Sequence, residues 1–272
     1  MNNTIITDLH VHSIHSSDAK NSIEENCLSA ISKGISILGF TDHIDIDYPG
    51  EGVFSKLDKN VYISDINECK KKYFHDLTVL TGLEIGLQPH LKEITDTLSK
   101  QFDVDYIIGS THCVMGEEIS ANGLFKNRGM IESYNRYFEA IIENISTIDN
   151  FDILGHLDFI ERYYPSNDKI LKYENHSTLI DIILKILIDK KKALEINTSG
   201  YRYKLGKPHP SFEVIKRYKE LGGEFICIGS DAHFANHIGA DFDKAKNMLI
   251  EAGFTRYHYF IKQQPVSLEI SL

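Results

Sequence analysis

The sequence predicts an α/β fold in which alternating strands and helices close into a barrel resembling a TIM barrel. Two observations support this. Short apolar, β-rich runs recur along the 272 residues, and polar or helical segments of roughly 25–45 residues separate most of them. No linker rich in Pro, Gly or Ser divides the chain, so we expect one domain over residues 1–272. The carboxyl ends of barrel strands carry the chemistry, and the residues after each run are therefore the functional candidates.

Seven apolar runs are expected to form the strands. They cover residues 4–9, 36–40, 78–85, 106–109, 151–154, 193–196 and 224–228. Between them, Ser22 and Glu25 have the spacing of a capping box, which predicts that a helix begins there. Apolar side chains at helical spacing in residues 131–145 and 210–221 predict two further helices that pack against the sheet.

Composition and charge narrow the possible partners. The chain has 39 acidic and 29 basic residues, for a net charge of -10, whereas nucleic-acid binding needs a basic face. The N-terminus lacks the features of a signal peptide, and the longest apolar stretch near the middle, residues 179–188, is far shorter than the roughly 20 residues of a membrane span. Four cysteines stand singly, as is typical of reduced thiols. We expect a cytoplasmic protein with no nucleic-acid or membrane partner.

Metal-type side chains follow most of the apolar runs. The sequence has 13 histidines, and the run ends carry HVH at 10–12, TDH at 41–43, GLE at 82–84, STH at 110–112, GHLD at 155–158 and SDAH at 230–233. In an extended chain His10 and His12 point to the same side and can bind one ion together. Imidazole and carboxylate without thiolate suit Zn, Mn or Fe. Their recurrence at equivalent positions predicts a site for more than one metal ion.

These motifs, in this order and over almost the whole chain, resemble the polymerase and histidinol phosphatase (PHP) family of metallophosphoesterases. The resemblance implies a distorted (β/α)7 barrel that holds two or three divalent metal ions at the carboxyl ends of its strands. By this resemblance one metal is held by His10, His12, Glu84 and Asp231, a second by Glu84, His112 and His156, and a third by His43, His233 and Asp18. Family members often have histidine at the position of Asp18, which leaves His15 as the alternative ligand.

Within the family, residues 155–163 and 195–202 resemble the stand-alone histidinol-phosphatase branch. That branch implies hydrolysis of the small phosphomonoester L-histidinol phosphate to L-histidinol and phosphate, a step of histidine biosynthesis, by a metal-bridging hydroxide. The oligomeric state is not readable from the sequence.

Roles for individual residues follow as expectations. Guanidinium groups match phosphate oxygens, so Arg162 and Arg202 are the candidates for phosphate binding, with Ser230 adding a hydrogen bond. The catalytic set is Glu84 with Asp231 and His233, of which the latter two are candidates to protonate the leaving group. Other polar residues are expected to support the site. Asp42, Asp158 and Asn197 would orient ligand imidazoles, Glu161 would meet the substrate's ammonium group, and the loop with His209 would reach the site mouth.

Three alternatives stay open. The first is a PHP-family phosphoesterase for another small phosphomonoester such as a nucleotide, because metal ligands read phosphate and not the alcohol. The second is an amidohydrolase-like metal hydrolase that cleaves C–N bonds; those enzymes share the HxH motif but commonly use a bridging lysine, which no strand end supplies here. The third is a non-catalytic binding module, which would not need the full ligand set.

Overall fold

The computed structural model describes residues 5–49, 57–119, 123–165 and 171–270, and its central sheet confirms the barrel prediction. Seven parallel strands follow one another in the order β1-β2-β4-β5-β8-β9-β10. They are β1 (Thr7–Val11), β2 (Ile37–Phe40), β4 (Thr78–Gly86), β5 (Tyr106–Ser110), β8 (Ile153–Leu154), β9 (Ala193–Asn197) and β10 (Ile226–Gly229). Each lies in or beside one of the expected runs; residue 4 of the first run is outside the described residues.

The first and last strands meet, so the barrel is nearly closed. Val11 pairs with Ala232 just beyond β10, and the His12 amide donates to the Ala232 carbonyl at 2.9 Å. Gly229 permits this close approach, since a Cβ there would collide with the Cβ of His10. The short β3 (His43–Ile44) pairs with β4 outside the main order of strands, which makes the barrel irregular.

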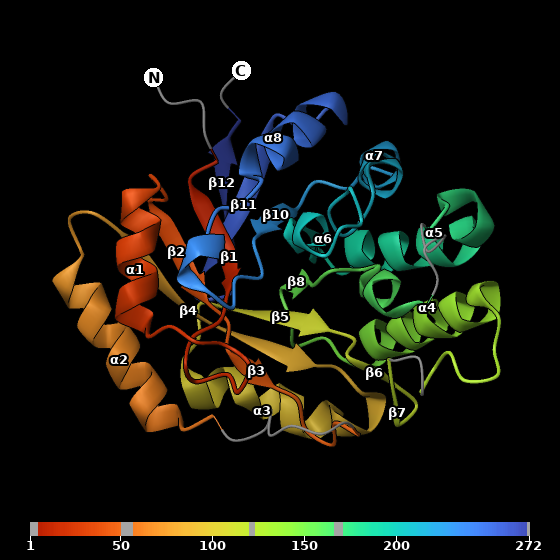
Figure 1. Ribbon diagram of the computed structural model, residues 1–272, viewed down its shortest axis with the longest axis horizontal. Helices are drawn as coiled ribbons and strands as arrows, with labels where there is room; N and C mark the ends of the chain where they lie inside the picture. The colour runs from red at the N-terminus through yellow and green to blue at the C-terminus, as the bar shows by residue number, and fades with distance from the viewer. Residues whose placement is uncertain (1–4, 50–56, 120–122, 166–170, 271–272) are drawn as a thin grey trace.

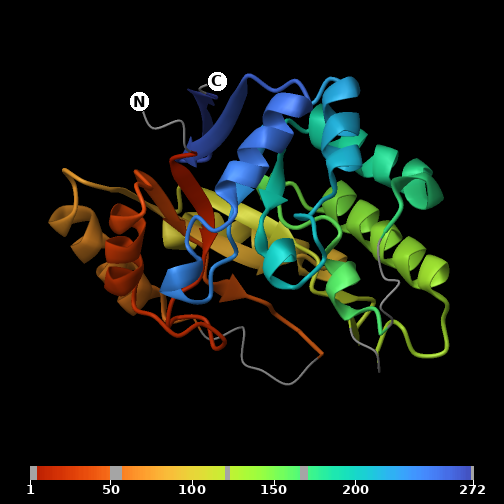
Figure 2. The same ribbon diagram turned by 45° about the horizontal axis from the view of Figure 1, so that its top comes forward.

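Helices surround the sheet (Figures 1 and 2). They are α1 (Ile23–Ser32), α2 (Lys59–Lys72), α3 (Lys92–Phe102), α4 (Met130–Thr147), α5 (Tyr173–Asp189), α6 (Ser199–Arg202), α7 (Phe212–Glu220) and α8 (Phe242–Glu251), with 3-10 turns at Pro89–Leu91, Phe159–Tyr163 and Ala235–His237. The expected capping box begins α1, where Ser22 and Glu25 bond each other's backbone amides. The two apolar stripes predicted from the sequence form α4 and α7, and most of their apolar side chains are buried.

The interior of the barrel is packed with side chains and is not a channel. Every strand of the barrel contributes to one buried cluster, formed by Leu9, Ile37, Leu80, Tyr106, Ile108, Ile153, Ala193, Cys227 and Phe260. A second apolar layer lies between the sheet and the helices. The four cysteines are free and buried, as expected. In the described part of the chain, no helix has the length and apolar character needed to cross a membrane.

A C-terminal hairpin, which the sequence reasoning did not predict, contacts the end of the barrel where the strands begin. It consists of β11 (Arg256–Ile261) and β12 (Gln264–Glu269), and the Gln263 amide donates to the carbonyl of Asp105, just before β5, at 2.7 Å. Its two turn residues, Lys262 and Gln263, have φ of 49° and 59°. Such turns usually carry Asn or Gly, so the ordinary sequence signal is missing. A smaller ribbon joins β6 (Cys113–Val114) to β7 (Glu117–Glu118).

Candidate metal centre

His10 and His12 at the end of β1 lie side by side, with ring centroids 5.1 Å apart. Both are fully buried, and their Nε2 atoms lie 3.1 and 3.4 Å from Oε2 of Glu84. Neither Nε2 makes a hydrogen bond within the described residues. A buried polar nitrogen without a partner is costly. Two such nitrogens aimed at one carboxylate fit a divalent cation, and the pair therefore meets a physical test for a metal site.

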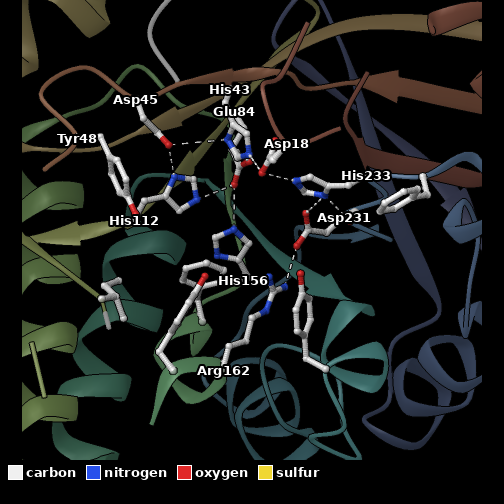
Figure 3. A pocket seen from close by; sticks show the side chains of 15 residues that line it. Asp18, His43, Asp45, Tyr48, Glu84, His112, His156, Arg162, Asp231 and His233 are labelled. Atoms are coloured by element: carbon white, nitrogen blue, oxygen red, sulfur yellow. Dashed lines mark hydrogen bonds and ion pairs between the residues drawn. The ribbon is translucent and has the colours of Figure 1, made fainter. Parts of the chain in front are cut away.

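Glu84 on β4 is at the centre of the cluster (Figure 3). Its carboxylate oxygens lie 2.9–3.4 Å from five imidazoles, those of His10, His12, His43, His112 and His156. Oε2 faces the first three of these rings and Oε1 faces the last two, while the Ser110 hydroxyl donates to Oε1 at 2.6 Å. The two oxygens thus face two different groups of histidines, which is the arrangement that a bridging ligand needs.

The remaining expected ligands complete the cluster. Asp231 Oδ1 lies 3.5 Å from Nε2 of His12, and Asp18 Oδ2 lies 3.1 Å from Nε2 of His233 and 3.8 Å from Nε2 of His43. Four groups of three have ligand atoms within 4.8 Å of one another, namely His12–His43–His233, His10–His12–Asp231, His10–Glu84–His156 and His43–Glu84–His112. The structure places His15 elsewhere, 3.0 Å from Asp65, so Asp18 is the residue beside His43 and His233.

Asp231 is held in an uncommon backbone conformation. Its φ is 53°, a left-handed value that most side chains avoid but aspartate tolerates. Arg202 Nη2 donates to the carbonyls of Ser230 and Asp231 at 2.5 and 2.8 Å. Ser230 is itself fully buried, and its amide donates to Asp8 at 2.9 Å. These contacts fix the turn that carries Asp231 toward the histidines.

The two expected phosphate-binding arginines have different surroundings. Arg162 lines the pocket above the cluster, and its Nη2 donates to Asp231 Oδ2 at 2.8 Å. Its guanidinium carbon lies 4.6 Å from the ring centroid of Phe159 and 4.1 Å from that of Tyr203, close enough for cation–π contacts. Arg202 instead lines a neighbouring hollow. Asp231 lines both this hollow and the first pocket. Arg162 is therefore the arginine that faces the cluster directly.

Carboxylates outside the cluster orient its imidazoles. Glu195 Oε1 lies 2.6 Å from Nδ1 of His10, and Asp45 Oδ2 lies 2.8 Å from Nδ1 of His112. Such partners fix the ring orientation and the tautomer of a ligand histidine. Neither role was predicted from the sequence for Glu195 or Asp45. Glu195 nevertheless leaves a signal, because it lies two residues before Asn197 and so on the same face of β9.

The residues that were expected to orient imidazoles act less directly. Asp42 accepts from the Ser16 hydroxyl at 2.6 Å, and Ser16 lies 3.3 Å from His12 Nδ1. Asn197 is the exception, because its Nδ2 lies 3.4 Å from Nδ1 of His10 and also donates to Glu195 at 3.1 Å. Asp158 bonds His209, which belongs to none of the four ligand groups around Glu84 and Asp231. Glu161 is likewise buried beside Lys207 and is not among the pocket's lining residues.

The pKa values of the cluster respond to burial and to neighbouring charge. Burial by itself raises the pKa of Glu84, but His10 and the other imidazoles outweigh it and hold the pKa well below its usual range. Burial likewise raises the pKa of Asp231, but Arg162 and the neighbouring imidazoles outweigh this effect. The pKa of Asp231 is therefore also held well below its usual range. Burial and the adjacent imidazoles lower the pKa of His12. Ionised carboxylates and a neutral imidazole are the forms that bind metals.

A pocket of about 260 Å³ opens above the cluster (Figure 3). Seven of the nine expected ligands line it, and aromatic side chains form much of the remaining wall, namely Tyr48, Phe159, Tyr163, Tyr203 and Phe234. The polar floor and the aromatic wall together suit a small organic molecule with a charged end.

Comparison with known proteins identifies a family and several sequence relatives. A family model described as the PHP domain matches residues 8–199. A protein of Clostridium acetobutylicum named "Probable histidinol-phosphatase" is 32% identical over 249 residues, covering 90% of this chain and 92% of its own length. The histidinol-phosphatase of Lactococcus lactis is 28% identical over 248 residues and covers 91% of each.

A search of solved structures also finds a histidinol phosphatase. The crystal structure of histidinol phosphate phosphatase from Lactococcus lactis, complexed with Zn, L-histidinol and phosphate, superposes with a TM-score of 0.88 and 26% sequence identity, over 96% of this chain and 98% of that one. The family match covers most of the barrel and contains eight of the expected ligand and phosphate-binding positions from His10 to Arg162. The chain belongs to the PHP-domain family of proteins.

Proposed function

We propose that this chain is a metal-dependent histidinol-phosphatase, which hydrolyses L-histidinol phosphate to L-histidinol and phosphate for histidine biosynthesis in the cytoplasm. The observation that carries the proposal is the convergence of nine metal-type side chains beneath one small pocket. It is supported by similarity along the whole barrel to a protein that binds Zn, L-histidinol and phosphate. We propose that residues 1–272 act as one barrel unit.

The donor set fits two or three divalent ions. We assign one to His10, His12, Glu84 and Asp231, a second to Glu84, His112 and His156, and a third to His43, His233 and Asp18. When bound, such ions supply Lewis acidity toward phosphoryl oxygens and make water a stronger acid. Imidazole and carboxylate donors suit Zn, Mn or Fe, and the related crystal structure contains Zn.

Arg162 is the principal phosphate-binding side chain in this proposal. Its Nη2 donates to Asp231 and to Ser199, while its Nη1 makes no hydrogen bond within the described residues and belongs to a side chain that lines the pocket. A guanidinium held in this way presents a fixed donor to a phosphoryl oxygen. Arg202 contributes by holding the carbonyls of Ser230 and Asp231.

The leaving alkoxide needs a proton, and we assign the relay to Asp231 and His233. His233 Nδ1 lies 3.4 Å from Asp231 Oδ1. The His233 side chain is 21% exposed, against 5% for Asp231, so the pair connects the pocket floor to solvent. A proton can therefore reach the pocket from water through this pair.

The test compares substrates on the metal-loaded protein. Phosphate release is measured with L-histidinol phosphate, nucleoside monophosphates and p-nitrophenyl phosphate. We expect kcat/KM for histidinol phosphate to exceed the others by at least about 100-fold, because a site that reads a substrate's polar groups rejects analogues that lack them. A preference for nucleotides would favour the broader phosphoesterase alternative, and no phosphate release from any of them would refute the phosphatase assignment.

A further inference from the structure

A cluster of charged side chains lies behind Arg162, outside the metal centre. Lys207 Nζ lies 2.8 Å from Asp158 Oδ2 and 2.5 Å from Glu161 Oε2. The side chains of Asp158, Glu161 and His209 are fully buried. Their ligand atoms lie within 4.8 Å of one another, as in a metal site. The Lys207 ammonium already supplies the cation between the two carboxylates, so we do not assign a metal here.

Such a buried cluster needs a reason to exist, because desolvating several charges can cost more than their mutual attraction returns. Hydrogen bonds connect this cluster to Arg162 and suggest its role. Asp158 Oδ1 lies 2.5 Å from Nδ1 of His209, Nε2 of His209 lies 3.3 Å from Nε of Arg162, and Arg162 Nη2 donates to Asp231. A continuous chain of hydrogen bonds therefore joins the buried cluster to the metal centre.

The chemistry of the two neighbours determines the state of His209. The Nε of arginine can only donate, so Nε2 of His209 must accept and carries no proton. An ionised Asp158 can only accept, so the proton lies on Nδ1. Burial lowers the pKa of His209 to about 4, with Arg162 and Lys207 adding to burial against the opposing effect of Asp158. A neutral ring with this tautomer satisfies both partners.

We propose that His209 is a positioning residue that sets the orientation of Arg162 for phosphate binding; this inference rests on the proposed phosphatase function. The rings of Phe159 and Tyr203 pack against the guanidinium, whose carbon lies 4.6 and 4.1 Å from their centroids. Hydrogen bonds hold the guanidinium at Nε through His209 and at Nη2 through Asp231 and Ser199. Nη1 is then the donor that remains for a phosphoryl oxygen.

Two substitutions of similar size separate positioning from packing. His209→Asn keeps an amide donor for Asp158 but cannot reach Arg162, whereas His209→Gln places an acceptor near the original Nε2. We expect His209→Asn to raise KM and the inhibition constant of inorganic phosphate by about 10- to 100-fold, the effect of losing a hydrogen bond to a charged group. Metal content and kcat should change little, and His209→Gln should restore most of the affinity.

The double variant tests whether His209 acts through Arg162. In an Arg162→Ala background, His209→Asn should have no further effect on phosphate affinity. An equal loss in both backgrounds, or wild-type affinity in His209→Asn itself, would overturn the proposal. Inorganic phosphate is the probe because its binding does not depend on which alcohol the substrate carries. A failure of the substrate assignment therefore remains distinguishable from a failure of this inference.

A measurement on the unmodified protein covers the case in which a variant does not fold. In the Zn-loaded enzyme, ¹⁵N NMR of the histidine side chains should show His209 neutral and protonated on Nδ1 between about pH 6 and 8, where a free imidazole would titrate. A proton on Nε2, or an imidazolium in this range, would contradict the hydrogen bond from Arg162 and overturn the proposal.

Discussion

Replacing the central carboxylate with its neutral isostere, Glu84→Gln, should remove metal and activity and leave the fold intact. The amide keeps the shape of the side chain, but it carries no negative charge and presents an NH2 group to one set of imidazoles. The two oxygens of Glu84 face different groups of histidines. The first and the second of the proposed metal ions therefore both lose a ligand in this variant. The apolar cluster inside the barrel does not include Glu84, and the amide has almost the same size as the carboxylate, so we expect the packing to be retained.

The size of the effect follows from these contacts. If each of two ions stabilises the transition state by about 3 kcal/mol, their loss lowers kcat/KM by about 10⁴-fold. Metal bound at about 1,000 times its dissociation constant stabilises the folded protein by about 4 kcal/mol. For a chain of this length that corresponds to a fall of about 7 °C in Tm when wild-type protein is treated with chelator. Glu84→Gln should show almost no response to the chelator.

Three measurements check this expectation: metal per chain by elemental analysis, phosphate release from histidinol phosphate, and thermal unfolding with and without chelator. Glu251→Gln is the matched control, since Glu251 is exposed at the end of α8. It should behave as wild type in all three measurements. Full metal content together with a wild-type rate in Glu84→Gln would refute the site assignment.

Three further predictions test the surroundings of the site. Glu195→Gln weakens the partner of His10, so metal affinity measured by competition with a coloured chelator should fall by about 10- to 100-fold, and unchanged affinity would contradict the orienting role. Arg202→Ala releases the carbonyls of Ser230 and Asp231, so KM for histidinol phosphate should rise about tenfold, whereas unchanged kinetics would contradict a supporting role for Arg202. Burial, and to a lesser extent the charge of Asp158, raises the pKa of Glu161 from 4.5 to about 7 in the folded protein. The protonated Glu161 side chain therefore contributes its full stabilisation below about pH 4.5, the pKa in the unfolded chain, and this stabilisation is lost as the pH rises through about 7. Glu161→Gln removes that dependence, so chemical denaturation of the metal-free proteins should favour the variant by about 3 kcal/mol more at pH 8 than at pH 4, and parallel pH profiles would contradict it.

The barrel and the residues that converge at its metal-type cluster could be predicted because both leave local signals. An apolar run followed by HVH, TDH or GLE is readable from adjacent residues, since the strand and its functional end are continuous in sequence. The orienting partners leave no such signal. Glu195 meets His10 across 185 positions, and His209 meets Arg162 across 47. Which carboxylate bonds which ring depends on side-chain approach between separate strands and loops, and the closed barrel determines that approach.

The fold also explains why the C-terminal hairpin and the role of Asp158 were not predicted. The hairpin turn uses Lys262 and Gln263 in left-handed conformations, without the residues that usually indicate such a turn. Asp158 follows His156 closely, and this spacing suggested a partner for a ligand ring. The chain enters a 3-10 turn directly after Asp158, and this carries the carboxylate toward His209 and Lys207 instead.

The contact between β1 and the segment after β10 has a consequence for how the enzyme matures. The proposed ligands extend along the chain from His10 to His233, and the two ends of this set come together where Val11 meets Ala232. During synthesis the HVH segment emerges long before SDAH, and a pair of imidazoles alone retains metal weakly. Pairing over such a sequence separation is a late event in folding. We therefore expect metal loading to follow this closure, and a chain truncated before the SDAH segment to retain metal weakly and to release no phosphate.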